Sequence, residues 1–219
     1  MNERVWQLLL DSFWQILLPG IRVTIPLTLV SFSLGLVIAL LTAMVQVANI
    51  PVLKQMARIY VWIIRGTPLL VQLFLIFYGL PSVGIVLDAI SAAIIVFSFN
   101  TGAYASETVR AAIEAVPAGQ LEAGYWVGMN YLQIMARIVL PQALRTAFPP
   151  LSNSLIGLVK DTSLAANITV AEMFMSGQRI AARSLEVMAI YCEVAFVYLL
   201  FCTVLTKLQS YCEKRMKIY

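Results

Sequence analysis

The sequence predicts an all-α protein, a polytopic membrane helix bundle of about five spans that forms a single domain over residues 1–219. Of these residues, 61% are hydrophobic and only 12% are charged, whereas soluble domains have about 45–50% and about 25%. The apolar residues also gather in runs long enough to cross about 30 Å of hydrocarbon, which takes about 20 helical residues. These runs cover about 14–48, 57–80, 85–113, 149–170 and 185–209.

The first run follows a polar stretch that contains Glu3, Arg4 and Asp11, and it has no small-residue cleavage site. We therefore expect a retained first helix rather than a removed signal peptide. Near Pro19 and Gly20 the segment can either tilt across the bilayer or begin as a turn at the membrane surface.

The second run is interrupted at Arg65–Pro68. Proline leaves a carbonyl group unpaired, and the residue before it is pushed out of helical geometry. A broken span is tolerated only against protein or a water-filled cavity. We therefore expect a break here, with Arg65 as a structural or gating residue and Gln72 as a candidate for the substrate path.

Four polar residues recur on one helical face of the third run, spaced four, three and seven apart: Asn100, Tyr104, Glu107 and Glu114. Polar groups at membrane depth usually line the bundle interior or a substrate path. We expect Asn100 and Tyr104 to line such a path. Glu107 lies nearer the end of the run, and we expect it to pair with an arginine such as Arg110 or Arg137.

The fourth run carries a polar sector that includes Ser154, Lys160 and Asp161. Adjacent helical residues point about 100° apart, so Lys160 and Asp161 cannot pair within an unbroken helix. Each needs another partner, or the helix unwinds there. The pair could belong to an ion-pair network that holds the bundle together, or serve as an ion relay in a stand-alone secondary carrier or channel.

The Lys and Arg residues of the loops predict the orientation. Nine fall on one side and three on the other, and the richer side is cytoplasmic. The N-terminus is then outside and the C-terminus inside the inner membrane. The richer side holds Lys54, Arg58, Arg110, Arg137, Arg145, Lys207, Lys214, Arg215 and Lys217, and the other side holds Arg4, Arg179 and Arg183.

The longest segment between runs, about 114–148, falls on the cytoplasmic side. Pro117 and Pro141 bracket an expected amphipathic helix whose apolar residues recur at helical spacing: Leu121, Tyr125, Met129 and Leu132. We expect this helix to lie across the membrane face as a docking surface.

Several chemistries are disfavoured by the residues present. The chain has no His, and its three cysteines, Cys192, Cys202 and Cys212, share no helical face, so we expect no metal site. The chain has no cluster of carboxylates that would indicate an enzyme. It also has no basic patch with interleaved aromatic residues that would indicate nucleic-acid binding. The chain lacks a phosphate-binding loop, so any ATP chemistry must come from another subunit.

One motif in the cytoplasmic segment resembles the EAA loop of ABC importer permeases. The family pattern is Glu-Ala-Ala, a glycine six residues after the glutamate, and a later Ile-x-Leu-Pro. This chain has Glu122, Ala123, Gly124, Gly128, Ile138, Leu140 and Pro141 at those positions. Gly124 replaces the second alanine, and Val127 stands where Asp or Asn is common.

The resemblance implies a coupling helix that sits in a groove of an ATP-hydrolysing partner, with Glu122, Ala123, Gly124 and Gly128 as its contact residues. Two alternatives remain for the same residues. Gly124 and Gly128 also fit a small-xxx-small dimerisation motif, and the segment could be an interfacial helix without a partner.

Further stretches resemble the polar amino-acid branch of these permeases, which includes the histidine and glutamine permeases. They are "RGTPL", "YGLP", "LPPLSNS" and "LVKDTSLAA", and together they look most like the permeases of L-cystine importers. Relatives that carry basic amino acids have a glutamate where this chain has Ser154. A serine can only form hydrogen bonds, which favours a neutral polar substrate.

The resemblance therefore implies a type I ABC importer permease that works by alternating access. The implied partners are a second permease copy or a close homologue, two cytoplasmic ATP-binding subunits, an extracytoplasmic amino-acid-binding protein and membrane lipid. No cofactor is expected in this chain, because ATP and Mg would be bound by the partner ATPase.

Overall fold

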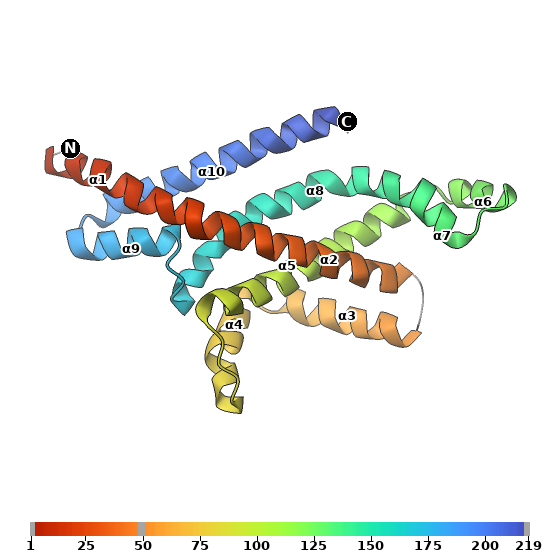
Figure 1. Ribbon diagram of the computed structural model, residues 1–219, viewed down its shortest axis with the longest axis horizontal. Coiled ribbons are helices and arrows are strands. Elements are labelled where there is room, and N and C mark those ends of the chain that lie inside the picture. Colours follow the sequence, from red (N-terminus) through yellow and green to blue (C-terminus); the bar gives the residue numbers. More distant parts are fainter. Residues whose placement is uncertain (1–2, 48–50, 217–219) are drawn as a thin grey trace.

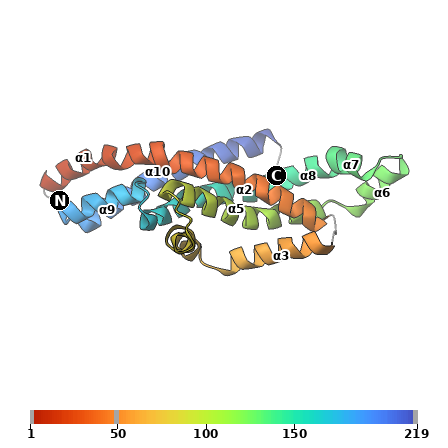
Figure 2. The same ribbon diagram turned by 60° about the horizontal axis from the view of Figure 1, so that its bottom comes forward.

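The computed structural model describes residues 3–47 and 51–216. Helices run along the long axis of the molecule (Figure 1), and the described residues contain no strand. The prediction of an all-α membrane bundle is confirmed. The N-terminal end of the described chain lies opposite the end that carries α6 (Ala118–Trp126) in both views (Figures 1 and 2).

The first apolar run is one helix over Glu3–Val47, 45 residues long. It consists of α1 (Glu3–Pro19), a wider π-helical turn η1 (Gly20–Thr24) and α2 (Ile25–Val47). Pro19 lacks an N–H donor, and such wider turns are one way in which a helix accommodates a local irregularity. The helix begins earlier than the predicted run, whose last residue, Ala48, lies outside the described residues. At about 1.5 Å per residue it is more than twice as long as a bilayer core is thick.

The second run is broken, as predicted. It comprises α3 (Pro51–Gly66), α4 (Leu69–Phe74), the π-helical turn η2 (Leu75–Gly79) and the 3-10 turn η3 (Leu80–Val83). The two halves meet at an angle of 105°. Pro68 has an extended backbone, with ψ 137°, and α4 therefore projects away from the bundle (Figure 1).

The central helix is α5 (Ala89–Glu114), close to the predicted third run. The Asp88 carboxylate caps it by accepting hydrogen bonds from the N–H groups of Ile90 and Ser91, at 3.1 and 3.0 Å. Hydrogen bonding by Ser91, first from its side chain and then from its backbone N–H, holds the pKa of Asp88 below its usual value. Capping of this kind satisfies N–H groups that have no partner inside the helix.

The fourth run is α8 (Leu140–Asp161) followed by a 3-10 helix η5 (Thr162–Ile168). The helix starts before the predicted position and its α-helical part ends at Asp161 rather than near residue 170. α9 (Met173–Ser184) and α10 (Val187–Arg215) complete the chain. The long first helix, α5 and α10 are apolar enough to span a membrane by themselves, and the bent α3–α4 pair could form a further span. The remaining predicted span, the fourth run, is the more polar α8, which packs against α5.

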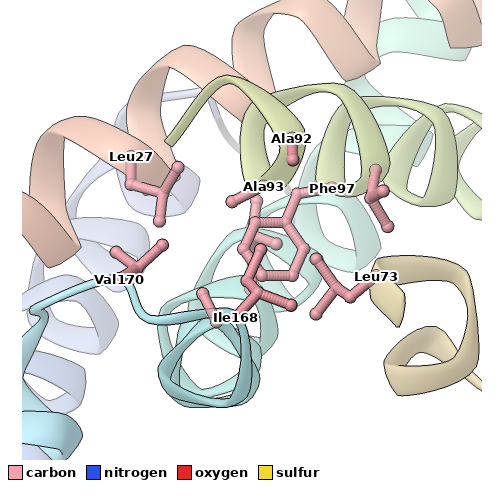
Figure 3. Close-up of a cluster of buried hydrophobic side chains, with 10 residues drawn as sticks. Leu27, Leu73, Ala92, Ala93, Phe97, Ile168 and Val170 are labelled. Atoms are coloured by element: carbon pink, nitrogen blue, oxygen red, sulfur yellow. The ribbon is translucent and has the colours of Figure 1, made fainter. Parts of the chain in front are cut away.

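A buried cluster holds the broken span against the bundle (Figure 3). Phe97 of α5 is fully buried, and around it lie Leu27 of α2, Leu73 of α4, and Ile168 and Val170 after α8. Four segments that are distant in sequence therefore share one core. This core fixes the position of the helix break relative to α5 and α8.

Candidate translocation cavity and coupling loop

A cavity of about 570 Å³ lies between the break of the second span, α5 and the end of α8. It brings together several residues that the sequence analysis singled out on separate helices. Its walls are formed by Arg65, Gly66, Thr67, Pro68, Leu69, Asn100, Thr101, Tyr104, Ser154, Gly157, Leu158, Asp161 and Leu164. A polar cavity beside a broken helix is the setting in which irregular backbone is tolerated at membrane depth.

Arg65 reaches from the break toward the polar face of α5. Its guanidinium lies 5.3 Å from the centroid of the Tyr104 ring, within the range of a cation–π interaction. Its Nη1 is 3.9 Å from an oxygen of Glu107. Glu107 is held much more closely by Arg110, at 2.8 Å, and Arg110 also contacts Glu114 at 2.7 Å. The predicted pairing of Glu107 with Arg110 is confirmed.

Gln72 does not line the cavity. Its side chain is buried and turns back across the helix break. The side-chain nitrogen donates to the carbonyl oxygens of Ile64 and Thr67, at 2.8 and 3.1 Å, and to the Thr67 hydroxyl at 2.9 Å. The side-chain oxygen accepts a hydrogen bond from Asn100 at 3.2 Å. Gln72 therefore satisfies the carbonyl groups that the break leaves unpaired and joins the break to α5.

We expect Gln72→Leu to destabilise the protein, because it leaves partly buried carbonyl groups and the Asn100 amide without partners. One unsatisfied buried group costs about 1–3 kcal/mol. Thermal unfolding in lipid nanodiscs measures the effect, with Gln15→Leu as the matched control, since Gln15 bonds only an exposed carbonyl on α1. Equal unfolding temperatures for the two variants would contradict the role assigned to Gln72.

Ser154, Lys160 and Asp161 lie on or near the last turns of α8. The Ser154 hydroxyl donates to the carbonyl of Pro150 at 3.0 Å, and its oxygen can still accept a bond from the cavity. The α-helix ends at Asp161, which fits the alternative that the helix unwinds there. The side chains of Lys160 and Asp161 form no hydrogen bond and no ion pair within 4.0 Å with the described residues, so neither belongs to an ion-pair network within that part of the chain.

The segment between α5 and α8 contains two short helices rather than the single helix predicted between Pro117 and Pro141. After α6 the chain turns at Gly128, whose φ of 82° favours glycine. α7 (Tyr131–Ile134) then begins with a capping box in which Asn130 and Gln133 bond each other's backbone N–H. Gly128 therefore makes the turn and does not continue a helix face.

Gly124 is buried against its own chain. A Cβ atom at this position would lie 2.7 Å from Cγ1 of Ile134, so the glycine allows α6 and α7 to pack closely. Glu122 and Ala123 are exposed, and the Glu122 carboxylate has no hydrogen bond or ion pair with the described residues. Large apolar side chains nearby are exposed as well, namely Tyr125, Trp126, Val127 and Leu132.

The chain matches, over residues 35–218, the family described as "Binding-protein-dependent transport system inner membrane component". This chain belongs to that family. It is 49% identical over 215 residues to the L-cystine transport system permease protein TcyB of Bacillus subtilis (strain 168), covering 98% of this chain and 92% of that protein. It is 34% identical over 205 residues to the glutamine transport system permease protein GlnP of Escherichia coli (strain K12), covering 93% and 94%.

A solved structure described as an amino acid ABC transporter with histidines has the same fold. Its chain superposes with a TM-score of 0.90 at 30% sequence identity, and the match covers 98% of this chain and 100% of that one. The resemblance of the sequence to permeases of polar amino-acid ABC importers is therefore confirmed. As a member of this family, the chain is a multi-pass component of the inner membrane. Family membership favours an importer permease over a stand-alone carrier or channel.

Two buried acids, Glu172 and Glu193, were not among the residues predicted from the sequence, and Glu172 is fully buried. The Glu172 carboxylate accepts bonds from the N–H groups of Phe174 and Met175, both at 2.7 Å, and from the Tyr198 hydroxyl at 3.1 Å. It caps α9 and joins it to α10. The signal available was an acidic residue just before an apolar helical segment, which is typical of a helix start.

Proposed function

We propose that this chain is the permease subunit of an ATP-driven importer of neutral polar amino acids, and that its substrate is L-cystine. The likeness to TcyB over nearly the whole chain carries this proposal. The cavity supports it, because Asn100, Tyr104 and Ser154 place hydrogen-bonding groups on its walls. Gln72 is assigned to the support of the cavity wall rather than to the path itself.

The chain would act with a second permease copy or a close homologue, two cytoplasmic ATP-binding subunits and an extracytoplasmic binding protein. ATP and Mg would be bound by the ATP-binding subunits, and this chain would have no ATPase site. The exposed apolar side chains of α6 and the following turn suit a protein partner, because an exposed apolar patch often marks an interaction site.

The proposed orientation places α6 in the cytoplasm, the N-terminus outside and the C-terminus inside. Lys54, Arg58 and Arg110 line a second cavity of about 300 Å³, formed with Gln46 at the end of α2 and Glu114 at the end of α5. This end of the bundle faces α6 (Figure 1). A concentration of basic residues at one end is typical of the cytoplasmic side.

The helical segment from Tyr131 to Asp161 provides a mechanical connection for alternating access. α7, a π-helical turn η4 (Met135–Val139) and α8 follow one another without interruption. α6 packs against α7 through Gly124, and Ser154 and Asp161 at the far end line the cavity. ATP-driven closure of the partner subunits would displace α6, and this segment would carry that displacement to the cavity walls.

We expect Ser154→Glu to shift substrate preference from cystine toward arginine or lysine. The new carboxylate would lie on the cavity wall, where a cationic side chain gains a charge-assisted hydrogen bond. Competition between labelled cystine and unlabelled arginine during uptake measures the shift, with Ser154→Gln as the uncharged control of matched size. An unchanged competition profile for the Glu variant would exclude Ser154 from contact with the substrate.

A further inference from the structure

A glutamine on α8 connects that helix to α6 across the irregular turn η4. The side-chain nitrogen of Gln142 donates hydrogen bonds to Oε1 of Gln120, on α6, and to the carbonyl oxygen of Ile138, in η4, at 2.8 Å. Both glutamines are half-buried. Among the described residues, the bond from Gln142 to Gln120 is the one side-chain hydrogen bond between α6 and α8. A single amide group therefore holds the turn, α6 and α8 together.

The turn that this side chain crosses is a place where the helical segment from Tyr131 to Asp161 can bend. Pro141 has no N–H group, so it cannot bond the carbonyl oxygen of Arg137 four residues earlier. The helix is widened here to the π-helical turn over Met135–Val139. Helices bend preferentially at prolines and at such turns. A displacement applied before Pro141 can therefore be lost by bending before it reaches the rest of α8.

The closest packing of α6 lies on one side of this bend. A Cβ atom at Gly124 would be 2.7 Å from the side chain of Ile134, on α7, and 3.4 Å from that of Ile138. Both isoleucines precede Pro141 in the chain, whereas Gln142 follows it directly. The packing at Gly124 therefore holds α6 to the near side of the bend, and the hydrogen bond from Gln142 holds it to the far side.

We propose that Gln142 is a positioning residue that braces this bend, so that a displacement of α6 moves α8 instead of bending η4. The inference rests on the proposed function and deepens it, because it names a residue that keeps transport coupled to ATP hydrolysis. Loss of the brace leaves Glu122 and the exposed apolar side chains of α6 unchanged, so the ATP-binding subunit still docks. The helix α8 then follows α6 less completely, and ATP is hydrolysed without a matching uptake of substrate.

The test measures labelled L-cystine imported per ATP hydrolysed by the permease, its ATP-binding subunit and its binding protein in liposomes. Gln142→Leu removes both hydrogen bonds, and Gln120→Leu removes only the one between α6 and α8. Each should lower the ratio about 2- to 10-fold, the effect expected for the loss of a neutral hydrogen bond. The rate of ATP hydrolysis and the amount of co-purified ATP-binding subunit should not change. The double variant should be no worse than the poorer single variant, because both changes remove the same brace.

Two further variants serve as controls. Gln120→Glu keeps an oxygen acceptor for the Gln142 nitrogen and should retain the unsubstituted ratio. Gln178→Leu makes the same chemical change at an exposed position of α9 and should also retain it.

Two results would overturn the brace while the importer stands. One is an unchanged ratio in both single leucine variants. The other is a proportional loss of uptake, ATP hydrolysis and co-purified ATP-binding subunit, since an unchanged ratio at lower assembly indicates a purely structural role. If the unsubstituted complex shows no ATP-dependent cystine uptake, the proposed function is overturned instead.

Discussion

Substitution of Glu122 by arginine is expected to abolish ATP-dependent uptake while leaving the protein in the membrane. Glu122 is exposed on α6 and has no partner within the described chain, so its loss removes no internal contact. A partner that offers a cation or a backbone donor to a carboxylate would instead meet a positive charge, and like-charge contact at an interface costs several kcal/mol. Uptake of labelled cystine into proteoliposomes loaded with ATP measures the result.

The matched control is Glu213→Arg, which makes the same change of charge on α10, near the C-terminal end of the chain. Glu213 is half-buried and accepts a local bond from Gln209, so its loss removes one contact within α10, and uptake by this variant should stay within about twofold of the unsubstituted level. Co-purification of the ATP-binding subunit provides a second readout. Normal uptake by Glu122→Arg would show that α6 does not couple the two proteins through this residue.

Gly102→Val is expected to destabilise the protein by overpacking a close helix interface. Gly102 lies where α5 meets α2 and α3, and a Cβ atom there would be 2.6 Å from Cγ2 of Ile38 and 2.9 Å from the hydroxyl of Tyr60. That hydroxyl is itself engaged, since it donates to the carbonyl of Phe99 at 2.6 Å. Overpacking of a close interface costs about 1–3 kcal/mol. The midpoint of thermal unfolding in nanodiscs should fall by several degrees.

Gly119→Ala is the control for this prediction. No atom lies within 4 Å of a Cβ placed at Gly119, and alanine is the better helix former by up to about 1 kcal/mol. Its unfolding midpoint should be equal to or higher than that of the unsubstituted protein. A Gly102→Val variant that unfolds at the same temperature would mean that α2 and α5 do not approach each other this closely.

Local patterns were enough to predict the membrane bundle, the break at Pro68 and the polar face of α5. Each of these features depends on residues within one segment, where hydrophobic run length, proline chemistry and helical spacing decide the outcome. The pairing of Glu107 with Arg110 was predictable for the same reason, because residues three apart on a helix are neighbours.

Spacing along one helix could not establish how side chains from different segments meet. Gln72 was expected on the substrate path, yet its side chain bonds the carbonyl groups of the break. The choice depends on the orientation of α4 relative to α3, which is fixed by packing around Phe97 and Leu73. Arg65 and Asp161 were considered separately for the same reason, and only the fold places them on one cavity.

The segment between Pro117 and Pro141 was predicted as one helix because apolar spacing continued through Gly128. The pattern does not distinguish a glycine that continues a helix from one that ends it. Here the turn is favoured by the positive φ of Gly128 and by the capping box at Asn130. The Asn130-x-x-Gln133 spacing is a helix-start signal, and it was present in the sequence.

Competitive uptake by the reconstituted complex tests the central claim most directly. The permease, its ATP-binding subunit and its binding protein are placed in liposomes, and uptake of labelled L-cystine is followed with unlabelled cystine, arginine or glutamine as competitors. We predict uptake that requires ATP and is suppressed by cystine but not by an equal concentration of arginine. Uptake that proceeds without ATP, or that arginine suppresses as well as cystine does, would contradict the account.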